Sequence, residues 1–172
     1  GGIRARVRDV RLTGAGGAFC SGMDLKGFAK GENISAATEF LRQGSDKPII
    51  AAINGAAAGL GLIISLYCDI RFASDKAKFT TAFSRRGLVA EHGISWLLPR
   101  LIGFANAADL LYSARVITAP EANGMGLVSR VIPAEEFERE VMAYAKMLAT
   151  EVSPRSLREM KREIWAAQFQ TL

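Results

Sequence analysis

The stretch "GLVAEHGISW", residues 87–96, contains the single histidine of the chain, His92, and the acidic residue Glu91 directly before it. Glycines and apolar residues surround the pair. A carboxylate in such a setting can take a proton from carbon and return it, provided that nearby groups stabilise the negative charge that develops. The alternative interpretation is an ordinary polar loop between two buried elements.

Two glycine-rich stretches could supply the stabilising groups. "TGAGGAFCSGMDLKGF" begins at Thr13, and "KPIIAAINGAAAGLGLIISLYCDIRFAS" begins at Lys47. Each leads from an apolar strand towards a helix, and the first N–H groups of a helix have no partners within it. Two such loops facing each other would form an oxyanion hole of backbone donors. That arrangement suits a thioester carbonyl that becomes an enolate.

A nucleotide site is the competing interpretation of the first stretch. "GAGGAF", residues 14–19, partly matches the dinucleotide fingerprint, but Phe19 occupies the place of the third glycine. No acid follows at the distance that the fingerprint requires. We therefore do not predict nucleotide binding.

The two glycine-rich stretches resemble the enoyl-CoA hydratase/isomerase (crotonase) family. The shared motifs are "LTGAG-AFC-G-DL", "KP-IAA-NG-A-G-G" and "CD-R-A", followed by "LLPRLIG", "GLV--V-P" and "SP". They keep the family's order and cover essentially the whole chain. The resemblance implies an α/β fold with a repeated ββα spiral core over residues 1–132. It also implies carboxy-terminal helices over 133–172 that build a homotrimer, often paired into a hexamer. Members usually have further residues ahead of this chain's first, so we expect the amino-terminal part of the fold to be absent.

The resemblance assigns the oxyanion hole to two backbone N–H groups, those of Met23 and Leu60. The surrounding positions would bind an acyl-CoA substrate, and no cofactor is implied, because coenzyme A is part of that substrate. Lys26 is a candidate partner of the CoA phosphates, although a solvated lysine explains it equally well. Asp24 is expected to be a local hydrogen-bond acceptor. The complete predicted substrate-binding set is Met23, Asp24, Leu25, Lys26, Gly59, Gly61, Ile63 and Phe83.

Two positions depart from the family's pattern. Hydratases of the family hold a water between two glutamates, and the corresponding positions here are Ile63 and Phe83. Without two acids the usual arrangement for adding water is missing. Some isomerases of the family carry one acid at the place of Glu91. Ile63, Phe83 and Trp96 would enclose that carboxylate, and a desolvated carboxylate is a stronger base.

The resemblance therefore predicts conversion of 3-enoyl-CoA to trans-2-enoyl-CoA, with Glu91 moving the proton. His92 is a weaker candidate, because adjacent loop side chains often point apart. Three alternatives stay open: a hydratase of low activity, a lyase whose substrate supplies its own acid, and a non-catalytic member that binds acyl-CoA or RNA.

These residues require elements to position them, and hydrophobic periodicity with capping residues predicts those elements. Strands are expected at 7–14, 47–53, 68–74, 77–83 and 127–133, and a short helical turn at 23–28. Helices are expected at 35–43, 60–67, 94–103, 105–114, after the cap Thr118, over 134–149, and from Ser153 onward. Strands that alternate with helices indicate a largely parallel sheet.

Composition narrows the class of protein further. The chain has 172 residues, 49% hydrophobic, with a net charge of +5. Four arginines lie within residues 4–11, yet neither a helix-turn-helix nor an aromatic stacking motif accompanies them, so nucleic acid is not an expected partner. Cys20 and Cys68 lack metal-ligand spacing, so no metal site is predicted, and a reducing, cytoplasmic compartment fits them.

One uncharged run could be mistaken for a membrane span. Residues 49–68 contain no charge over twenty positions, which meets the length criterion for a transmembrane helix. A buried strand, an Asn-Gly turn and a buried helix would together also account for twenty uncharged residues. They also explain its glycines, so no membrane span is predicted.

Overall fold

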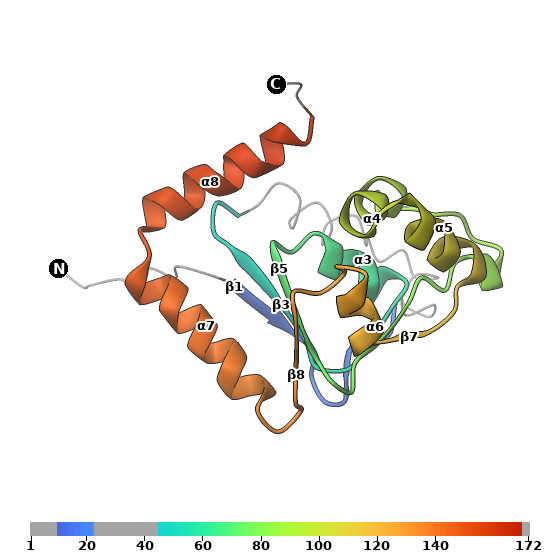
Figure 1. Cartoon of the computed structure of the whole chain (residues 1–172), viewed down its shortest axis with the longest axis horizontal. Coiled ribbons are helices and arrows are strands. Elements are labelled where there is room, and N and C mark those ends of the chain that lie inside the picture. The colour runs from blue at the N-terminus through green and yellow to red at the C-terminus, as the bar shows by residue number, and fades with distance from the viewer. Residues whose placement is uncertain (1–9, 23–44, 170–172) are drawn as a thin grey trace, which may run out of the picture.

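A computed structural model describes residues 10–22 and 45–169 of the chain (Figure 1). Its strands form two four-stranded sheets, A and B. Sheet A contains, in spatial order, β1 (Val10–Thr13), β3 (Ile49–Ile53), β5 (Ile70–Ser74) and β8 (Arg130–Ile132), all parallel. Sheet B contains β2 (Ala18–Cys20), β4 (Ala56–Ala58), β6 (Lys78–Thr80) and β7 (Ile117–Thr118), of which the last pair is antiparallel. From β1 to β6, consecutive strands alternate between the sheets, which confirms the repeated ββα arrangement.

Sheet A is buried on both faces because β3 is apolar throughout. Ile49, Ala51 and Ile53 face one core, which lies between the sheets and the central helices. Ile50 and Ala52 face a second core on the opposite side. Successive side chains of a strand point to opposite faces, so an unbroken apolar run is what a strand covered on both sides requires.

Helices follow the strands in the order that the sequence predicts. The helical elements are α3 (Leu60–Leu66), the 3-10 turn η1 (Ser84–Arg86), α4 (Ile94–Ile102), α5 (Phe104–Ser113), α6 (Ala119–Gly124), α7 (Phe137–Glu151) and α8 (Pro154–Ala167). The Thr118 side chain accepts a hydrogen bond from the Glu121 N–H, which confirms the predicted cap. The turn and helix predicted at 23–28 and 35–43 lie outside the described residues.

Sequence patterns missed three short strands of sheet B, namely β2, β4 and β7. Of these, β2 and β4 lie inside the glycine-rich stretches, for which the sequence predicts loops. Each strand is three residues long, and β4 consists of alanine alone. Neither contains a β-branched residue, and Phe19 of β2 is the single strand-favouring residue in the two, which is too little to predict a strand. Pairing with neighbouring strands forms them instead.

The uncharged run from 49 to 68 folds as β3, β4 and α3, which confirms the predicted strand and helix and adds β4 between them. Within the described residues, no helix is long and apolar enough to cross a bilayer.

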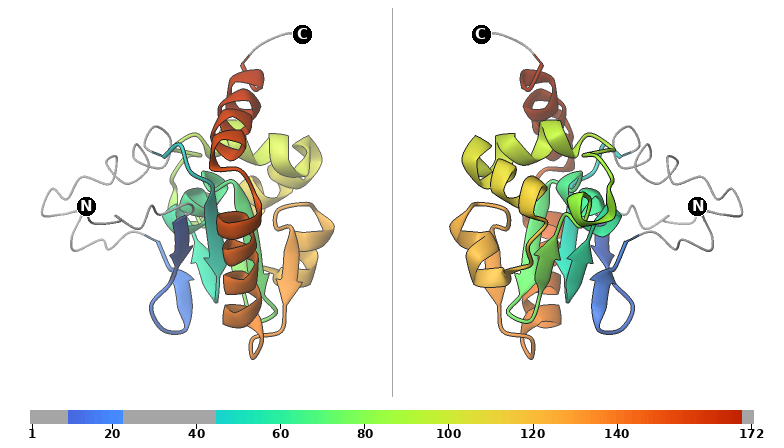
Figure 2. Two further views of the ribbon diagram at one scale, coloured as in Figure 1. Left: turned by 90° about the vertical axis from the view of Figure 1, so that its left-hand side faces the viewer. Right: turned by 90° about the vertical axis from the view of Figure 1, so that its right-hand side faces the viewer.

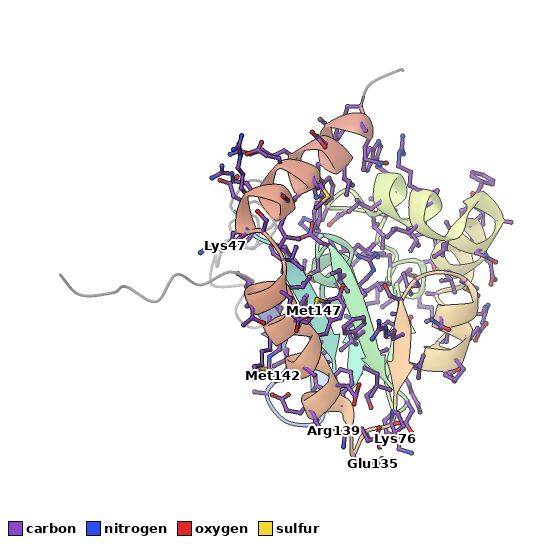
Figure 3. All side chains as sticks on the ribbon, turned by 60° about the vertical axis from the view of Figure 1, so that its left-hand side comes forward. Lys47, Lys76, Glu135, Arg139, Met142 and Met147 are labelled. Atoms are coloured by element: carbon purple, nitrogen blue, oxygen red, sulfur yellow. The ribbon has the colours of Figure 1, made fainter. Side chains whose placement is uncertain are left out.

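The two terminal helices cover different parts of the molecule. α7 lies along sheet A (Figures 1 and 2) and contributes Phe137, Val141, Ala145 and Leu148 to the second core. On its outer side Met142 is exposed, close to Arg139 (Figure 3). α8 stands beyond one end of the sheets (Figure 2) and buries none of its residues completely.

α8 is attached to the core mainly through Asp69, which follows Cys68 in the "CD" motif. One Asp69 oxygen accepts from the Ile49 N–H at 2.7 Å and from Lys161 Nζ at 2.8 Å. The other accepts from the Trp165 indole at 3.3 Å. Lys161 also donates to the carbonyl of Lys47 at 2.8 Å. A single carboxylate thus joins the start of β3 to the last helix.

Candidate active site

Three parallel strands of sheet B end side by side, and their carboxyl ends define the candidate site. The end of β2 leads to Gly22, that of β4 to Gly59 and that of β6 to Phe83. The space where a Cβ of Gly22 would lie is 3.3 Å from the Ala58 carbonyl, so the two glycine-rich stretches do meet. Ligands bind outside the carboxyl ends of parallel strands in many α/β folds.

Asn54 holds the two loops in register at the opposite end of β2 and β4. Its side-chain oxygen accepts from the Gly14 N–H at 3.1 Å. Its amide donates to the carbonyls of Gly16 at 2.8 Å and Gly14 at 3.3 Å. The sequence marked Asn54 as part of a turn. The structure shows that it also crosses between the loops.

Gly61 lets α3 approach β2 very closely. A Cβ at this position would lie 2.1 Å from the carbonyl oxygen of Cys20, which is an impossible contact. The helix bearing Leu60 therefore packs directly on the strand that leads to Gly22. Gly61 was predicted to contact substrate, and its observed contact is with this strand.

The start of α3 leaves a backbone donor available for the predicted oxyanion hole. The Gly59 N–H donates to the Thr80 carbonyl at 3.0 Å, and the Ile63 N–H donates to the Gly59 carbonyl at 3.1 Å. Within the described ranges, no backbone acceptor is recorded for the Leu60 N–H, as expected for the first residue of a helix. The second predicted donor, Met23, lies outside the described residues with Asp24, Leu25 and Lys26.

The two positions that the resemblance assigns to the usual hydratase acids are apolar and enclosed. Ile63 is fully buried in the first core, and Phe83 is 8% exposed at the start of η1. Neither can carry a proton. The structure thus places Ile63 in the packing beneath the site, whereas Phe83 also lines a groove beside it.

Glu91 lies on the loop between η1 and α4, and its side chain is 49% exposed. The enclosure that the sequence predicts for this carboxylate is therefore incomplete in the single chain. His92 Nε2 lies 3.8 Å from Glu91 Oε2. The expectation that the two side chains point apart is wrong.

Trp96 does not help to enclose Glu91, contrary to the prediction. Its indole stacks on Phe169, with ring centroids 4.9 Å apart, and the Arg100 guanidinium lies 3.9 Å from its ring centroid. Residues one position apart on a helix point about 100° apart. Ser95 and Pro99 accordingly face one side of α4, while Trp96 and Arg100 face another.

α4 therefore separates two hollows. One, of about 430 Å³, lies between α4 and α8, and none of the predicted site residues lines it. The other is a groove of about 580 Å³ beside the Glu91 loop. Most of the groove lining is apolar, and it includes Phe83, Leu88, Val89, Ala90, Phe104, Ala107, Ala108, Leu111 and Tyr112.

Sequence reasoning missed Tyr67, which contacts the Glu91 loop from the end of α3. Its hydroxyl donates to the His92 carbonyl at 2.9 Å. Tyr67 stands directly before the "CD" motif, but its contact spans 25 residues. No local pattern could have indicated a contact over that distance.

Strands that alternate between two sheets from β1 to β6, with glycine-rich stretches that meet at one sheet edge, define a class of protein. It is the ββα spiral fold. Comparison with known proteins identifies the family within that class. The family model for enoyl-CoA hydratase/isomerase matches residues 4–171. The chain belongs to the enoyl-CoA hydratase/isomerase family.

Relatives within the family carry names of both activities. A probable enoyl-CoA hydratase of Rhodobacter capsulatus is 41% identical over 85% of this chain and 60% of its own length. Enoyl-CoA delta isomerase 2 of Rattus norvegicus is 37% identical over 89% of this chain and 42% of its own length. The crystal structure of a monofunctional enoyl CoA isomerase from M. smegmatis superposes with a TM-score of 0.81 at 36% identity, covering 96% of this chain and 73% of that one. The chain spans about three fifths of the length of the first curated relatives.

Proposed function

We propose that the protein converts 3-enoyl-CoA to trans-2-enoyl-CoA. The Glu91 carboxylate removes a proton from C2 of the substrate, and the electrons move into a thioester enolate. The same carboxyl group returns the proton at C4, so that the double bond moves from C3–C4 to C2–C3. No cofactor takes part, and coenzyme A serves as the handle of the substrate.

The observation that carries the proposal is the contrast between Glu91 and the two positions where hydratases of the family have glutamates. Ile63 and Phe83 are buried and apolar, whereas Glu91 is accessible on a loop tied to α3. Adding water requires one group to activate the water and another to protonate the product carbon. One carboxylate is enough to shuttle a proton between two carbons.

The enolate oxygen would accept hydrogen bonds from the N–H groups of Leu60 and Met23. Gly22, which lies against Ala58, directly precedes Met23 in the chain. Removing one backbone or side-chain donor from such a hole costs about 10²–10³-fold in rate in other enzymes.

The remainder of the substrate would be held on either side of this centre. Asp24 and Leu25 would contact the bend of the CoA arm, and Lys26 its phosphates. The groove beside Phe83 and Ala90 offers apolar surface for the acyl chain. Gly59 would let the thioester approach the backbone at the start of α3.

The decisive experiment follows proton exchange in heavy water. We would measure deuterium uptake at C2 and C4 of a 3-enoyl-CoA by NMR, together with double-bond migration. The wild-type chain, Glu91→Gln and the control Glu151→Gln, which changes an exposed acid at the end of α7, would be compared. We expect exchange and migration in the wild type and the control, and neither in Glu91→Gln.

Each other result has a distinct meaning. Exchange that survives in Glu91→Gln would identify a different base. Hydration of a 2-enoyl-CoA without migration would indicate a hydratase. Thioester binding without exchange in the wild type would indicate a non-catalytic acyl-CoA-binding member.

We also propose that the chain acts in the cytoplasm as a homotrimer or hexamer. Met160 and Ile164 of α8 are 46% and 63% exposed, which leaves apolar surface for a second copy to cover. Light scattering coupled to size-exclusion chromatography would give the mass. A monomer at micromolar concentration would contradict the assembly.

A further inference from the structure

Tyr67 connects the two halves of the proposed active site. It is the residue that caps the end of α3, and its half-buried ring packs against the first core. Its hydroxyl donates to the carbonyl of His92 at 2.9 Å, a normal length for such a bond. The Glu91 loop is thus anchored to the same helix whose first residue is Leu60.

The anchored loop has an unusual backbone that needs support. His92 and Gly93 both adopt left-handed conformations, with φ of 52° and 77°. Left-handed backbone is uncommon for a residue with a side chain, and the surrounding structure must hold it there. The Ile94 N–H donates to the Glu91 carbonyl at 3.2 Å and closes this turn. The direction of the Glu91 side chain therefore depends on the turn being kept.

Gly93 makes room for the tyrosine hydroxyl. A Cβ at this position would lie 2.6 Å from Tyr67 Oη. The Tyr67 hydroxyl therefore contacts the loop in two ways. It donates a hydrogen bond to the carbonyl of residue 92, and it occupies the space that a side chain at residue 93 would need.

α3 is a short and continuous spacer between the two groups. The Tyr67 N–H donates to the Ile63 carbonyl at 3.3 Å, and the Ile63 N–H donates to the Gly59 carbonyl at 3.1 Å. The seven-residue helix thus links the candidate oxyanion donor at one end to the loop anchor at the other.

We propose that Tyr67 is a positioning residue, whose hydroxyl fixes Glu91 relative to the Leu60 N–H through the hydrogen bond to His92. This inference rests on the proposed function of Glu91. A displacement of about 1 Å at a reacting group can cost about 10²-fold in rate while substrate binding is unchanged. Tyr67→Phe removes the hydroxyl and keeps the packed ring, so it isolates this effect.

The test compares kcat, KM and melting temperature of the full chain for 3-enoyl-CoA isomerisation. In Tyr67→Phe we expect kcat to fall between about 10-fold and 10²-fold, with KM within about threefold of the wild type. Tyr144→Phe removes the hydroxyl of a tyrosine on α7 that packs against the second core, outside the groove, and should leave kcat unchanged. The melting temperatures of the two variants should agree closely, because both keep the ring.

Two further variants separate positioning from general loosening. Gly93→Ala should lower kcat as well, and its cost should be smaller in the Tyr67→Phe background, where no hydroxyl meets the new methyl group. In the Glu91→Asp background, whose carboxylate is already displaced, Tyr67→Phe should cost less than in the wild type. Such non-additivity shows that the two residues act on one step.

The outcomes distinguish this inference from the proposed function. A wild type that isomerises, with kcat unchanged in Tyr67→Phe, would overturn the role of Tyr67 alone. Additive losses of Tyr67→Phe and Glu91→Asp would overturn it too. A wild type that does not isomerise would overturn both proposals.

Discussion

Glu91 Oε2 and His92 Nε2 lie 3.8 Å apart, although the two residues are adjacent in the chain. The left-handed backbone at His92 turns its side chain towards the carboxylate. The pair raises the question of whether the imidazole shares in the proton transfer or only borders it.

We predict that the His92 imidazole lies beside the reacting groups and takes no part in the proton transfer. Because both side chains are partly exposed, water competes with the interaction between them and the pair is weak. Asparagine tolerates left-handed backbone, so His92→Asn removes the imidazole and keeps the turn. We expect its isomerase rate to stay within about fivefold of the wild type. A loss as large as that in Glu91→Gln would make His92 a proton carrier.

The ion pair between Asp69 and Lys161 should contribute strongly to stability. Their side chains are only 20% and 14% exposed, so removing one partner leaves a poorly solvated charge. We predict that Lys161→Met lowers the free energy of unfolding by about 2 kcal/mol, somewhat below the cost for a fully buried pair. Urea titration followed by circular dichroism measures the change.

An exposed ion pair on the same helix provides the matched control. Arg162 pairs with Asp46, and both side chains are more than half exposed. Arg162→Met should therefore cost less than about 1 kcal/mol. Equal costs for Lys161→Met and Arg162→Met would show that the Asp69 cluster has no special role in attaching α8.

The sequence was sufficient for the fold where the pattern is regular over many residues. The unbroken apolar run of β3 and the cap at Thr118 predict their elements from local chemistry. The short strands β2 and β4 were missed because each has only three residues and lies among glycines and alanines, which are depleted in strands. Whether such segments form strands depends on pairing with strands that are distant in the sequence.

The resemblance assigns roles to Leu60 and Glu91 from their positions in motifs, and these roles stay predictions. The geometry around them is not contained in the motifs. The contact of Tyr67 with His92 and the turning away of Trp96 depend on how α3 and α4 pack. No spacing along the chain carries that information.

Gly61 should be intolerant of any side chain. Its Cβ would meet the Cys20 carbonyl at 2.1 Å, and this backbone oxygen cannot move without displacing β2. We predict that Gly61→Ala destabilises the chain by about 1–3 kcal/mol, the usual cost of overpacking. Gly124→Ala is the control, since nothing lies within 4 Å of its Cβ position. Thermal unfolding of both variants checks the difference, and equal melting temperatures would refute the close contact.

The Cys68 thiol should not react with alkylating reagents in the folded chain. Burial raises the pKa of its thiol from 9.0 to about 12, partly offset by the nearby Arg71. Only the thiolate reacts with alkylating reagents. At pH 8 we therefore expect iodoacetamide to label the half-buried Cys20 and to spare Cys68 until the chain is unfolded. Mass spectrometry of the peptides decides, and labelling of folded Cys68 would contradict its burial.

The same shift makes stability depend on pH in the alkaline range. Between pH 9 and 12 the unfolded chain loses the Cys68 proton while the folded chain keeps it. Unfolding then releases a proton, so the free energy of unfolding falls as the pH rises through this range. Cys68→Ala should show a shallower decline than the wild type between pH 8.5 and about 10.5. Parallel curves would exclude a perturbed thiol.

The groove beside the Glu91 loop should set the length of acyl chain that the enzyme accepts. Ala108 lines it from α5 and is separate from the proposed proton-transfer groups. In Ala108→Trp the indole would fill part of the 580 Å³ and displace a long acyl chain, while a short chain needs little of that space. We predict that kcat/KM falls by about 10-fold or more for a twelve-carbon 3-enoyl-CoA, the effect of a few lost methylene contacts. For a six-carbon substrate it should change little. An equal loss for both substrates would place the acyl chain elsewhere and make the groove a surface for another subunit.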